Sequence, residues 1–409
     1  MQHILFISYD GMTDPLGQSQ VIPYLAGLTK YGYRFSILSC DKPDKYKAHQ
    51  QEVRSMLNGL PIQWHSIPYH KNPPVLSSVY DFWQMKKTIR QMQKNDPVDM
   101  VHTRPGLPAL LGVWMKKKFG TKFLNDIRGF WADERVDGGM WNLSNPLYKG
   151  IYRFFKRKED EAIRLADFNT CLTEKARREI LSWKQVPQPV RLEVIPCSVD
   201  MREFDPAAIN LEDQEVFRKE MGIGKTDLVV SYLGSIGGWY LTKEMMQCCK
   251  AILDAHTHAR FLFISNNRHE LIRSIAAEYG IPADRIITRF ARRQELPAIL
   301  SLSQYSLFFI KPCYSKISSS PTKQAEIMAL GIPVITNPGV GDVDEIVRTC
   351  NAGFILPDFS AGSMKKLSLQ LNTSSDFDRT RIRQGAFTYF DLEKAVEKYA
   401  GVYRLIFSK

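Results

Sequence analysis

The sequence predicts an α/β protein with two Rossmann-like domains, each built on a parallel sheet. Short apolar runs alternate with longer helix-like stretches along the chain, which is typical of parallel βα units. With 409 residues, the chain is longer than one hydrophobic core usually supports, so two domains are expected. The series of strand candidates also starts again near residues 184–195, where a proline-bearing stretch separates the two halves.

We place the domain boundary in this stretch, with a first domain over residues 1–187 and a second over 188–386. Strand candidates of the first half are HILFISY, RFSILSC, IQWHSIP, DMVHTR, KFLNDIR and FNTCLT. Those of the second half are LEVIPCS, DLVVSYLGS, ARFLFIS, RIITRF, YSLFFIKP, PVITN and AGFILP. Helices are expected between them, for example over 18–31 and 320–330. Residues 387–409 have apolar side chains at helical spacing and predict a terminal helix that packs back on the first domain.

Composition excludes several classes of protein. Hydrophobic residues make up 44% and charged residues 24%, as in globular domains and unlike disordered or fibrous chains. No run of about 18 apolar residues is present to cross a membrane. The first residues, MQHILFISYD, resemble a strand and lack the features of a signal peptide, so a cytoplasmic protein is expected. The 7 cysteines are scattered without a CxxC pair, which predicts free thiols and no metal site.

The charge balance predicts an anionic partner. Lys and Arg number 55 against 43 Asp and Glu, for a net charge of +12. Three kinds of partner would complement this positive charge: a phosphorylated substrate, an anionic membrane surface or nucleic acid. No nucleic-acid-binding motif is present, so no nucleic-acid partner is expected. Basic stretches with aromatic residues at 82–94, 113–120 and 147–158 favour contact with an anionic inner-leaflet surface, although solvated helix faces are the simpler explanation.

The most informative segment is ISSSPTKQAEIMALGIPVI at residues 317–335. Ser320 suits a helix N-cap and Pro321 suits the first helical position. Gly331 is suited to end the helix in the left-handed conformation. The start of such a helix, together with the nearby Lys323, favours binding of an anion.

Polar side chains near this helix start complete the expected site. Hydroxyl groups come from Ser318, Ser319, Ser320 and Thr322. Glu326 lies about two turns into the helix, where a carboxylate can accept hydrogen bonds from sugar hydroxyls. A diphosphate at the helix start and a ribose diol at Glu326 together describe a nucleotide diphosphate. A capped helix with one solvated glutamate fits the same spacing.

This segment resembles the donor-binding helix of family-4 glycosyltransferases with the GT-B fold, in which two Rossmann-like domains face each other across a cleft. The family usually carries two glutamates here, separated by seven residues. Glu326 matches the second, which typically holds the nucleotide ribose. Ser318 stands at the place of the first, which normally contacts the donor sugar. The resemblance implies a nucleotide diphosphate sugar as donor substrate, with no permanently bound cofactor and no required metal.

Two further segments resemble the same family. VIPCSVD at 194–200 resembles the element that opens the second domain. YLGSIGGWYLTKEMM at 232–246 resembles the loop and helix whose Gly, Arg and Lys bind donor phosphates. Ser235 stands where the family has Arg, and Gly237 and Lys243 follow it.

A later loop, NPGVGDVDEIV at 337–347, also matches the family, with Gly339 and Gly341 in a tight turn. The resemblance extends over nearly the whole chain. Because Ser235 replaces the family's Arg and Lys243 comes later than the family's Lys, we expect Lys323 to be the main cation for the donor phosphates, with Lys243 second.

In the first half, the loop SYDGMTDPLGQSQVIPYLAGL follows the first strand. It has no GxGxxG motif, so a nicotinamide or flavin site is not expected. Gly17 permits close approach of the backbone to a sugar or phosphate. In the resembling family this loop lies opposite the donor phosphates and helps to bind the acceptor, which implies roles for Asp14 and Gln18. An ordinary βα turn explains the same residues.

A second cluster in the first half is NDIRGFWADERVDGGMW, where charged residues crowd beside aromatic ones. By resemblance, Asp126 occupies the place of a side chain that reaches the donor sugar. Arg128 and Trp131 are candidates for the acceptor, as is Arg104 after the preceding strand. A structural ion-pair network fits the same composition, and His102 is expected to be a satisfied histidine at a strand end.

The resemblance and the site together predict transfer of a sugar from a nucleotide diphosphate sugar to a saccharide acceptor, with retention at the anomeric carbon. A lipid-linked acceptor and a role in polysaccharide or O-antigen assembly would explain the basic surface of a cytoplasmic or peripheral membrane enzyme. Two alternatives remain. One is a sugar-nucleotide epimerase of the same fold, and the other is a catalytically silent protein that binds glycans or partners.

Overall fold

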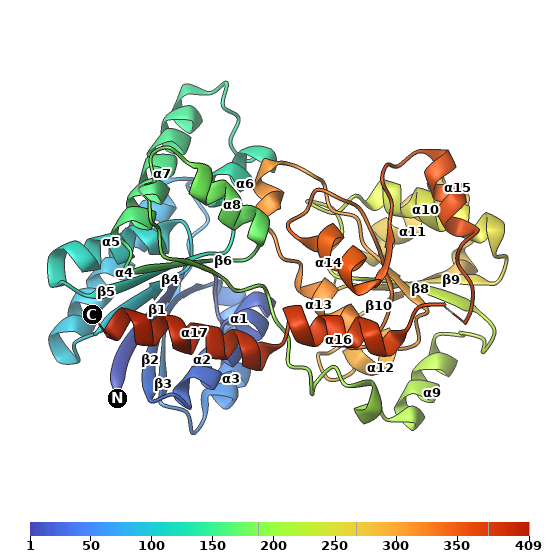
Figure 1. The fold of residues 1–409 in the computed structure, drawn as a ribbon, viewed down its shortest axis with the longest axis horizontal. Helices are drawn as coiled ribbons and strands as arrows, with labels where there is room; N and C mark the ends of the chain where they lie inside the picture. Colours follow the sequence, from blue (N-terminus) through green and yellow to red (C-terminus); the bar gives the residue numbers. More distant parts are fainter. Residues whose placement is uncertain (187, 267, 375, 409) are drawn as a thin grey trace. The chain divides into compact units, whose positions relative to one another are not determined.

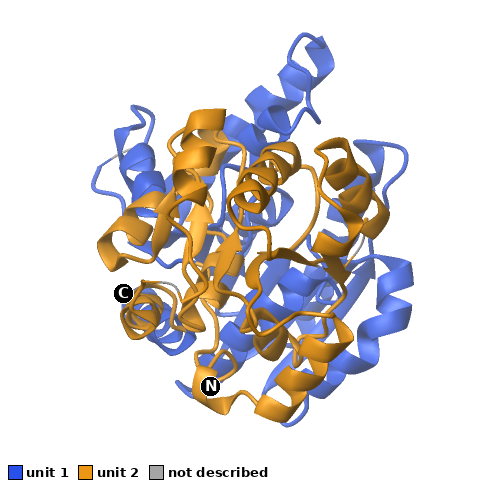
Figure 2. Cartoon of the chain, turned by 90° about the vertical axis from the view of Figure 1, so that its right-hand side faces the viewer, with its two compact units in different colours: residues 1–196, 392–409 blue, residues 197–391 orange. Residues whose placement is uncertain are grey.

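The structure, a computed structural model, describes residues 1–186, 188–266, 268–374 and 376–408. It divides into two compact units (Figures 1 and 2). Unit 1 comprises Met1–Pro196 and Leu392–Lys409, and unit 2 comprises Cys197–Asp391. Each unit has its own parallel sheet with helices packed on it, so the predicted fold class of two Rossmann-like domains is confirmed.

The sheet of unit 1 contains, in the described residues, seven parallel strands in the order β3-β2-β1-β4-β5-β6-β7. The strands are β1 (Gln2–Ser8), β2 (Tyr33–Asp41), β3 (Ile62–Pro68), β4 (Met100–Thr103), β5 (Lys122–Ile127), β6 (Phe168–Cys171) and β7 (Leu192–Val194). The helices are α1 (Pro15–Gln20), α2 (Ile22–Thr29), α3 (Pro43–Leu57), α4 (Leu76–Asn95), α5 (Leu107–Phe119), α6 (Trp131–Asp137), α7 (Pro146–Leu165), α8 (Glu174–Ser182) and α17 (Leu392–Phe407).

The central strand β1 contributes to a hydrophobic core on each face of this sheet. Ile4 and Phe6 join the core that α2 and α17 cover, whereas Leu5 and Ile7 join the core beneath α4 and α5. Successive side chains of a strand point to opposite faces, so a strand covered on both faces is apolar throughout. This is why the strand could be recognised as a continuous apolar run.

The terminal helix α17 belongs to unit 1, where it packs against α2. Tyr399 and Tyr403 are buried on its inner face. The Tyr403 ring packs edge-on against Tyr33 with centroids 5.0 Å apart, and its hydroxyl lies 2.8 Å from Nδ1 of His102 in β4. The helix therefore fills one core of unit 1 and gives Nδ1 of the buried His102 a hydrogen-bond partner, whereas Nε2 of the same ring has none among the described residues.

The sheet of unit 2 contains, in the part of the chain that the structure describes, six parallel strands in the order β10-β9-β8-β11-β12-β13. The strands are β8 (Leu228–Leu233), β9 (Ala259–Ile264), β10 (Ile286–Arg289), β11 (Tyr305–Leu307), β12 (Val334–Thr336) and β13 (Gly353–Ile355). The α-helices are α9 (Leu211–Glu220), α10 (Thr242–Ala255), α11 (His269–Glu278), α12 (Leu296–Leu300), α13 (Thr322–Ala329), α14 (Val343–Cys350), α15 (Ala361–Ser368) and α16 (Arg379–Tyr389). Short 3-10 helices are η1 (Pro206–Ala208), η2 (Ala283–Arg285) and η3 (Tyr314–Ser318). None of the described helices is long and apolar enough to span a bilayer.

Along the chain, the boundaries between the units differ from those predicted from the sequence. Residue 187, where the first domain was expected to end, lies outside the described residues. The segment LEVIPCS, placed in the second half, supplies β7, which pairs with β6 through Asn169↔Leu192. Unit 1 therefore continues to Pro196. At the other end, α16 runs through the expected boundary at 386, and unit 2 continues to Asp391.

The helix expected over 18–31 is two helices, α1 and α2, with a break at Val21 (φ −128°, ψ −64°). Pro23 explains the break, because proline has no amide hydrogen and its ring disfavours a helical conformation of the preceding residues. The break turns the chain just after Gln20, whose side chain takes part in the charged cluster of unit 1 described below.

Gly353 provides a test of the backbone packing in unit 2. Its φ is +138°, and a Cβ atom there would lie 2.0 Å from the carbonyl oxygen of Val334 in the neighbouring strand. We expect Gly353→Ala to lower the free energy of unfolding of unit 2 by about 2–4 kcal/mol, measured by urea denaturation. The matched control is Gly222→Ala, where φ is +62° and nothing lies within 4 Å, with a loss of about 1 kcal/mol. Equal losses in both variants would contradict the proposed backbone clash.

Candidate functional site

The candidate site of unit 2 lies at the carboxyl ends of β8 and β11. From β8, the chain builds the sheet outward through β9 and β10, and it then returns to add β11 on the other side of β8. Such a reversal of strand order leaves a crevice outside the carboxyl ends of the strands, where open α/β sheets bind their ligands. The loops at 234–241 and 308–321 follow these two strands.

Lys323, the second residue of α13, is buried beneath the loop after β8. Its Nζ lies 3.8 Å from the ring centroid of Tyr240 and 4.5 Å from that of Tyr232. It also lies 3.4 Å from the Tyr232 hydroxyl. Gly234 makes room for the amine, because a Cβ atom there would lie 2.6 Å from Nζ. Two aromatic faces and a glycine thus enclose the cation that the sequence singled out.

Burial lowers the pKa of Lys323 to about 7, and the charge of Glu326 only partly opposes this effect. A buried ammonium loses its hydration, and the ring faces replace only part of it. The amine is therefore close to half-protonated at neutral pH. An anion arriving beside it would favour the protonated form.

Glu326 is also buried, and its carboxylate forms an ion pair with Arg293. The same guanidinium binds Glu203 through Nε–Oε1 and Nη2–Oε2 contacts of 2.6 and 2.9 Å. Burial raises the pKa of Glu326, although Arg293 opposes the shift. The glutamate is thus fixed in position, and the alternative of a capped helix with a solvated glutamate does not hold.

The start of α13 differs from the expected one. The helix begins at Thr322 after Pro321, and its eight residues make it shorter than the helix expected over 320–330. Ser320 is not the N-cap, because its Oγ accepts a hydrogen bond of 3.2 Å from the backbone N–H of Cys197. No described side chain caps the helix, and the N–H of Gln324 donates to the carbonyl oxygen of Pro321 at 3.0 Å. The amide groups of the first two residues, Thr322 and Lys323, are left for another acceptor. The helix ends as expected, with Gly331 at φ +70°.

The serines before α13 are held by local contacts. Ser318, at the place of the first family glutamate, is buried and donates a hydrogen bond of 2.6 Å to the carbonyl oxygen of Ser315. Ser319 ends η3, with its N–H on the carbonyl oxygen of Lys316. Thr322 is half-buried at the first position of α13. Among these hydroxyl groups, only that of Thr322 lies on the helix itself.

The loop after β8 turns at glycines. Gly237 has φ +77°, and its N–H donates to Oγ1 of Thr242 at 3.3 Å. Ser235 is exposed, and its carbonyl oxygen accepts a hydrogen bond from the Tyr232 hydroxyl. Lys243 is exposed at the second position of α10. The structure therefore places Ser235 in the loop over Lys323, whereas Lys243 is not brought into contact with Lys323.

The glycine turn after β12 is tied to the segment before α13. Gly339 has φ +87°, and a Cβ atom there would lie 2.9 Å from Cβ of Pro312. The N–H of Gly341 donates to the carbonyl oxygen of Lys316 at 2.8 Å. The Lys316 side chain lies over the ring of Trp239, with Nζ 3.9 Å from its centroid. Three loops at the carboxyl edge of this sheet are therefore held together.

In unit 1, Asp126 is the centre of a buried charged cluster at the carboxyl end of β5. Its carboxylate accepts a hydrogen bond of 2.8 Å from Thr170 and lies 3.6 Å from Nε2 of His102 and 3.8 Å from Nη1 of Arg128. Burial raises the pKa of Asp126, but the nearby Arg128, His102 and Arg104 outweigh this effect and lower it to about 2. The carboxylate is ionised, and burial keeps His102 neutral by lowering its pKa.

Arg104 and Arg128 surround this carboxylate with positive charge. Arg128 donates to the Gln20 side chain at 3.2 Å, and Arg104 contacts the Gln20 carbonyl oxygen at 3.5 Å. Arg104 is buried, and among the described residues its Nε has no hydrogen-bond partner. Burial and the neighbouring Arg128 lower the pKa of Arg104. The cluster carries more positive than negative charge and is suited to receive an anionic or hydroxyl-rich group.

The loop after β1 is packed tightly. A Cβ atom at Gly17 would lie 2.5 Å from Cα of Met12. Asp14 forms ion pairs with Lys42 and Lys45 at 3.1 and 3.0 Å, which compete with any ligand. Gln18 is half-buried in α1. The close approach expected at Gly17 is thus made by the protein's own backbone.

Trp131 belongs to a different contact network from Asp126. Its ring packs against Gly106, where a Cβ atom would lie 2.6 Å away, and the guanidinium of Arg135 stacks over it at 3.4 Å. Phe155 of α7 lies 4.6 Å from it, centroid to centroid. Neighbouring residues of the segment NDIRGFWADERVDGGMW therefore belong to two separate groups, the charged cluster around Asp126 and the aromatic stack around Trp131.

Sequence reasoning did not single out Arg293, Tyr232, Tyr240, Trp239 or Lys316. An aromatic pair after the glycines of IGGWY was the available signal for the cover of Lys323. Arg293 lies 33 residues before its partner Glu326, and only the fold brings the two together.

Two family models match the chain, one over most of unit 1 and the first residues of unit 2, and the other within unit 2. The model described as Glycosyltransferase Family 4 matches residues 18–203, and the model described as Glycosyl transferases group 1 matches residues 213–386. With the two parallel sheets, these matches define a glycosyltransferase with the GT-B fold. The chain belongs to glycosyltransferase family 4.

Solved structures of the same fold are distant in sequence. A sucrose-phosphate synthase from Thermosynechococcus elongatus is 14% identical, with a TM-score of 0.72 and 100% of both chains covered. WaaG, a glycosyltransferase involved in lipopolysaccharide biosynthesis, is 14% identical, with a TM-score of 0.69 and coverage of 98% and 99%. Alr3699/HepE from Anabaena, in complex with UDP and glucose, is 11% identical, with a TM-score of 0.68 and coverage of 98% and 99%. Among curated proteins, none matches the chain.

The pKa of Lys323 makes a testable contribution to stability. An unfolded lysine has a pKa of about 10.4, so above pH 7 the unfolded chain binds more protons than the folded one, and stability rises with pH. Between about pH 7.5 and 9.5, the free energy of unfolding of the wild type should rise by up to about 1.4 kcal/mol per pH unit relative to Lys323→Met. Urea denaturation at several pH values measures this difference in the free energy of unfolding. Lys225→Met, at an exposed site, is the control, and parallel curves for wild type and Lys323→Met would refute the shift.

Proposed function

We propose that the protein transfers a sugar from a nucleotide diphosphate sugar to a saccharide acceptor, with retention at the anomeric carbon and without a metal ion. The observation that carries the donor site is Lys323, a buried amine with a near-neutral pKa beside an uncapped helix start at a sheet switch point. Anions are stabilised at such helix starts by amide groups and the helix dipole. Membership of family 4 and the UDP and glucose bound to Alr3699/HepE support this choice of ligand.

The donor is proposed to place its diphosphate at Lys323 and its ribose at Glu326. The two side chains lie three positions apart on one face of α13. Arg293 fixes the Glu326 carboxylate, and a fixed acceptor for two ribose hydroxyls costs little ordering on binding. Protonated Lys323 and the amides of the helix start neutralise the charge that develops on the leaving diphosphate. Donor binding is therefore coupled to proton uptake by Lys323.

For the reaction, we favour direct displacement on one face of the sugar. The bond between the anomeric carbon and the diphosphate oxygen breaks, and the acceptor oxygen bonds to the same face of that carbon. The leaving phosphate takes the acceptor proton. No nucleophilic side chain is required by this route, and the family resemblance supports it.

The acceptor is proposed to be a saccharide, carried on a lipid, that binds at the carboxyl edge of the unit 1 sheet. The excess positive charge of Arg104 and Arg128 around Asp126 supports an anionic or hydroxyl-rich group there. Assembly of a polysaccharide at the cytoplasmic side of a membrane fits this acceptor, as does the lipopolysaccharide role of the structurally similar WaaG.

Donor binding is the first test. In thermal unfolding with UDP-, GDP-, ADP- and dTDP-sugars, one base should stabilise the protein by about 2.7 kcal/mol at 100 times its dissociation constant. Glu326→Gln should lose this stabilisation because the ribose loses its carboxylate. Glu203→Gln, which removes the other carboxylate on Arg293, should retain most of it. An unselective result, or equal loss in both variants, would contradict the assignment of Glu326.

Turnover is the second test. With the selected donor and lipid-linked acceptors, the product should keep the anomeric configuration of the donor by NMR, and excess EDTA should leave the rate unchanged. Lys323→Ala should reduce kcat by about 100-fold. Inversion or loss of rate in EDTA would refute the mechanism. Selective donor binding without turnover would favour a silent binding protein, which Ser318 at the place of the family glutamate also favours.

A further inference from the structure

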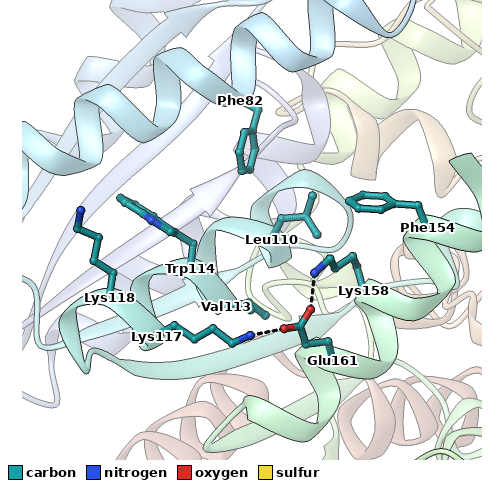
Figure 3. A pocket seen from close by; sticks show the side chains of 9 residues that line it. All are labelled: Phe82, Leu110, Val113, Trp114, Lys117, Lys118, Phe154, Lys158 and Glu161. Atoms are coloured by element: carbon teal, nitrogen blue, oxygen red, sulfur yellow. Dashed lines mark hydrogen bonds and ion pairs between the residues drawn. The ribbon is translucent and has the colours of Figure 1, made fainter.

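A groove with an apolar floor runs over α5 on the outside of unit 1 (Figure 3). Its volume is about 440 Å³. Leu110, Val113 and Trp114 of α5 line it, with Phe82 of α4 and Phe154 of α7 around Leu110. Lysines from α5 and α7 also line the groove, so its apolar floor carries a cationic rim.

Aromatic rings around the groove are paired with cations. On α4, Lys86 lies over Phe82 at 5.9 Å and Lys87 over Trp83 at 5.8 Å. Lys86 also reaches the ring of Trp114 of α5, at 4.7 Å. On α7, Lys158 lies over Phe154 at 5.9 Å. A lysine over an aromatic ring keeps its apolar stem against the protein and its ammonium group in water. The same arrangement is found at the boundary between water and lipid.

Apolar side chains continue along α4 and α7 beyond the groove. Leu76, Val79 and Trp83 of α4 are 66%, 59% and 52% exposed, and Leu147 and Phe154 of α7 are 62% and 43% exposed. Spacing of three or four residues keeps the α4 group on one side of the helix. Isolated exposed apolar residues are ordinary, but a group beside an apolar groove marks an interaction surface.

The charge of this face decides which partner it fits. The α4, α5 and α7 sequences carry net charges of +3 each, from 4 basic and 1 acidic, 3 basic and 0 acidic, and 6 basic and 3 acidic residues, of the +12 of the chain. Partial burial and repulsion from Arg90 and Lys118 lower the pKa of Lys86, which shows how closely the cations crowd. Within the groove, Glu161 binds Lys117 and Lys158 at 2.5 and 2.6 Å and holds both amines at the rim.

We propose that this face, formed by α4, α5 and α7 around the groove, docks the protein on an anionic phospholipid bilayer. The aromatic side chains enter the boundary between headgroups and acyl chains, and the lysines bind lipid phosphates. Crowded cations oppose a second copy of the same face, because like charges would meet across a symmetric contact. The proposal rests on the proposed function in one respect, since docking would bring the enzyme to a lipid-linked acceptor.

Vesicle sedimentation of the full chain tests this docking. The protein should bind phosphatidylglycerol vesicles at least about tenfold more tightly than phosphatidylcholine vesicles, and binding should weaken at high salt. The double variants Lys117→Glu/Lys118→Glu and Trp83→Ala/Phe154→Ala should each weaken binding at least about tenfold. Matched exposed controls in unit 2, Lys365→Glu/Lys366→Glu and Leu369→Ala/Leu211→Ala, should bind as the wild type does.

Thermal stabilisation by the nucleotide sugar, measured on the same variants, separates this proposal from the proposed function. Stabilisation without vesicle binding would overturn the docking face alone, and vesicle binding without stabilisation would overturn the donor site alone. Equal binding to neutral vesicles, or equal losses in the unit 2 controls, would overturn the docking face. A concentration-dependent dimer abolished by Trp83→Ala/Phe154→Ala, with no vesicle binding, would assign the face to a second copy instead.

Discussion

The burial of one lysine organises the proposed donor site in unit 2. Lys323 has lost most of its hydration, and the faces of Tyr232 and Tyr240 supply only part of what water would give. Gly234 leaves room for the amine, because a Cβ atom there would lie 2.6 Å from Nζ of Lys323. In the free protein, burial of the Lys323 amine is therefore unfavourable. A negatively charged ligand beside the amine would offset the free-energy cost of this burial. Binding energy and charge neutralisation come from the same atom.

The two units treat buried charge in opposite ways. In unit 2, Glu326 and Lys323 are kept apart, one fixed by Arg293 and the other enclosed by rings. In unit 1, Asp126 lies among Arg104, Arg128 and His102, so its charge is shared. The first arrangement leaves a single cation able to change its protonation with a ligand, whereas the second keeps a permanently ionised centre.

Much of the fold follows from the sequence because every strand of a doubly covered parallel sheet must be apolar. The strand candidates from HILFISY to AGFILP all correspond to strands of the structure. The assignment of LEVIPCS to the wrong half has a simple cause, since an apolar run does not reveal which sheet it pairs with. The start of α13 was misplaced because serine is a common N-cap residue. In the structure, the Ser320 hydroxyl instead accepts a hydrogen bond from the backbone N–H of Cys197.

The candidate site could be predicted only where it is local in the chain. Short segments contain Lys323, Glu326 and the glycines of the loops. In these segments, a few neighbouring residues determine where a turn forms and where a helix ends. Arg293 could not be found in this way, because its contact with Glu326 depends on where the fold places the loop between β10 and α12 relative to α13. The cluster after β5 was recognised as a unit, yet the structure divides it between the charged centre at Asp126 and the aromatic stack at Trp131.

Unit 2 is one continuous stretch of chain, whereas unit 1 is completed by α17 from beyond it. During synthesis, all residues of unit 2 are made before Tyr399 and Tyr403. Until then, the sheet face that contains Ile4, Phe6 and Phe35 is covered by α2 but lacks α17, so it exposes apolar surface in a nascent chain. Unit 2 is therefore complete in sequence before unit 1 is. Although most of unit 1 is made first, its core is completed only when α17 has been made.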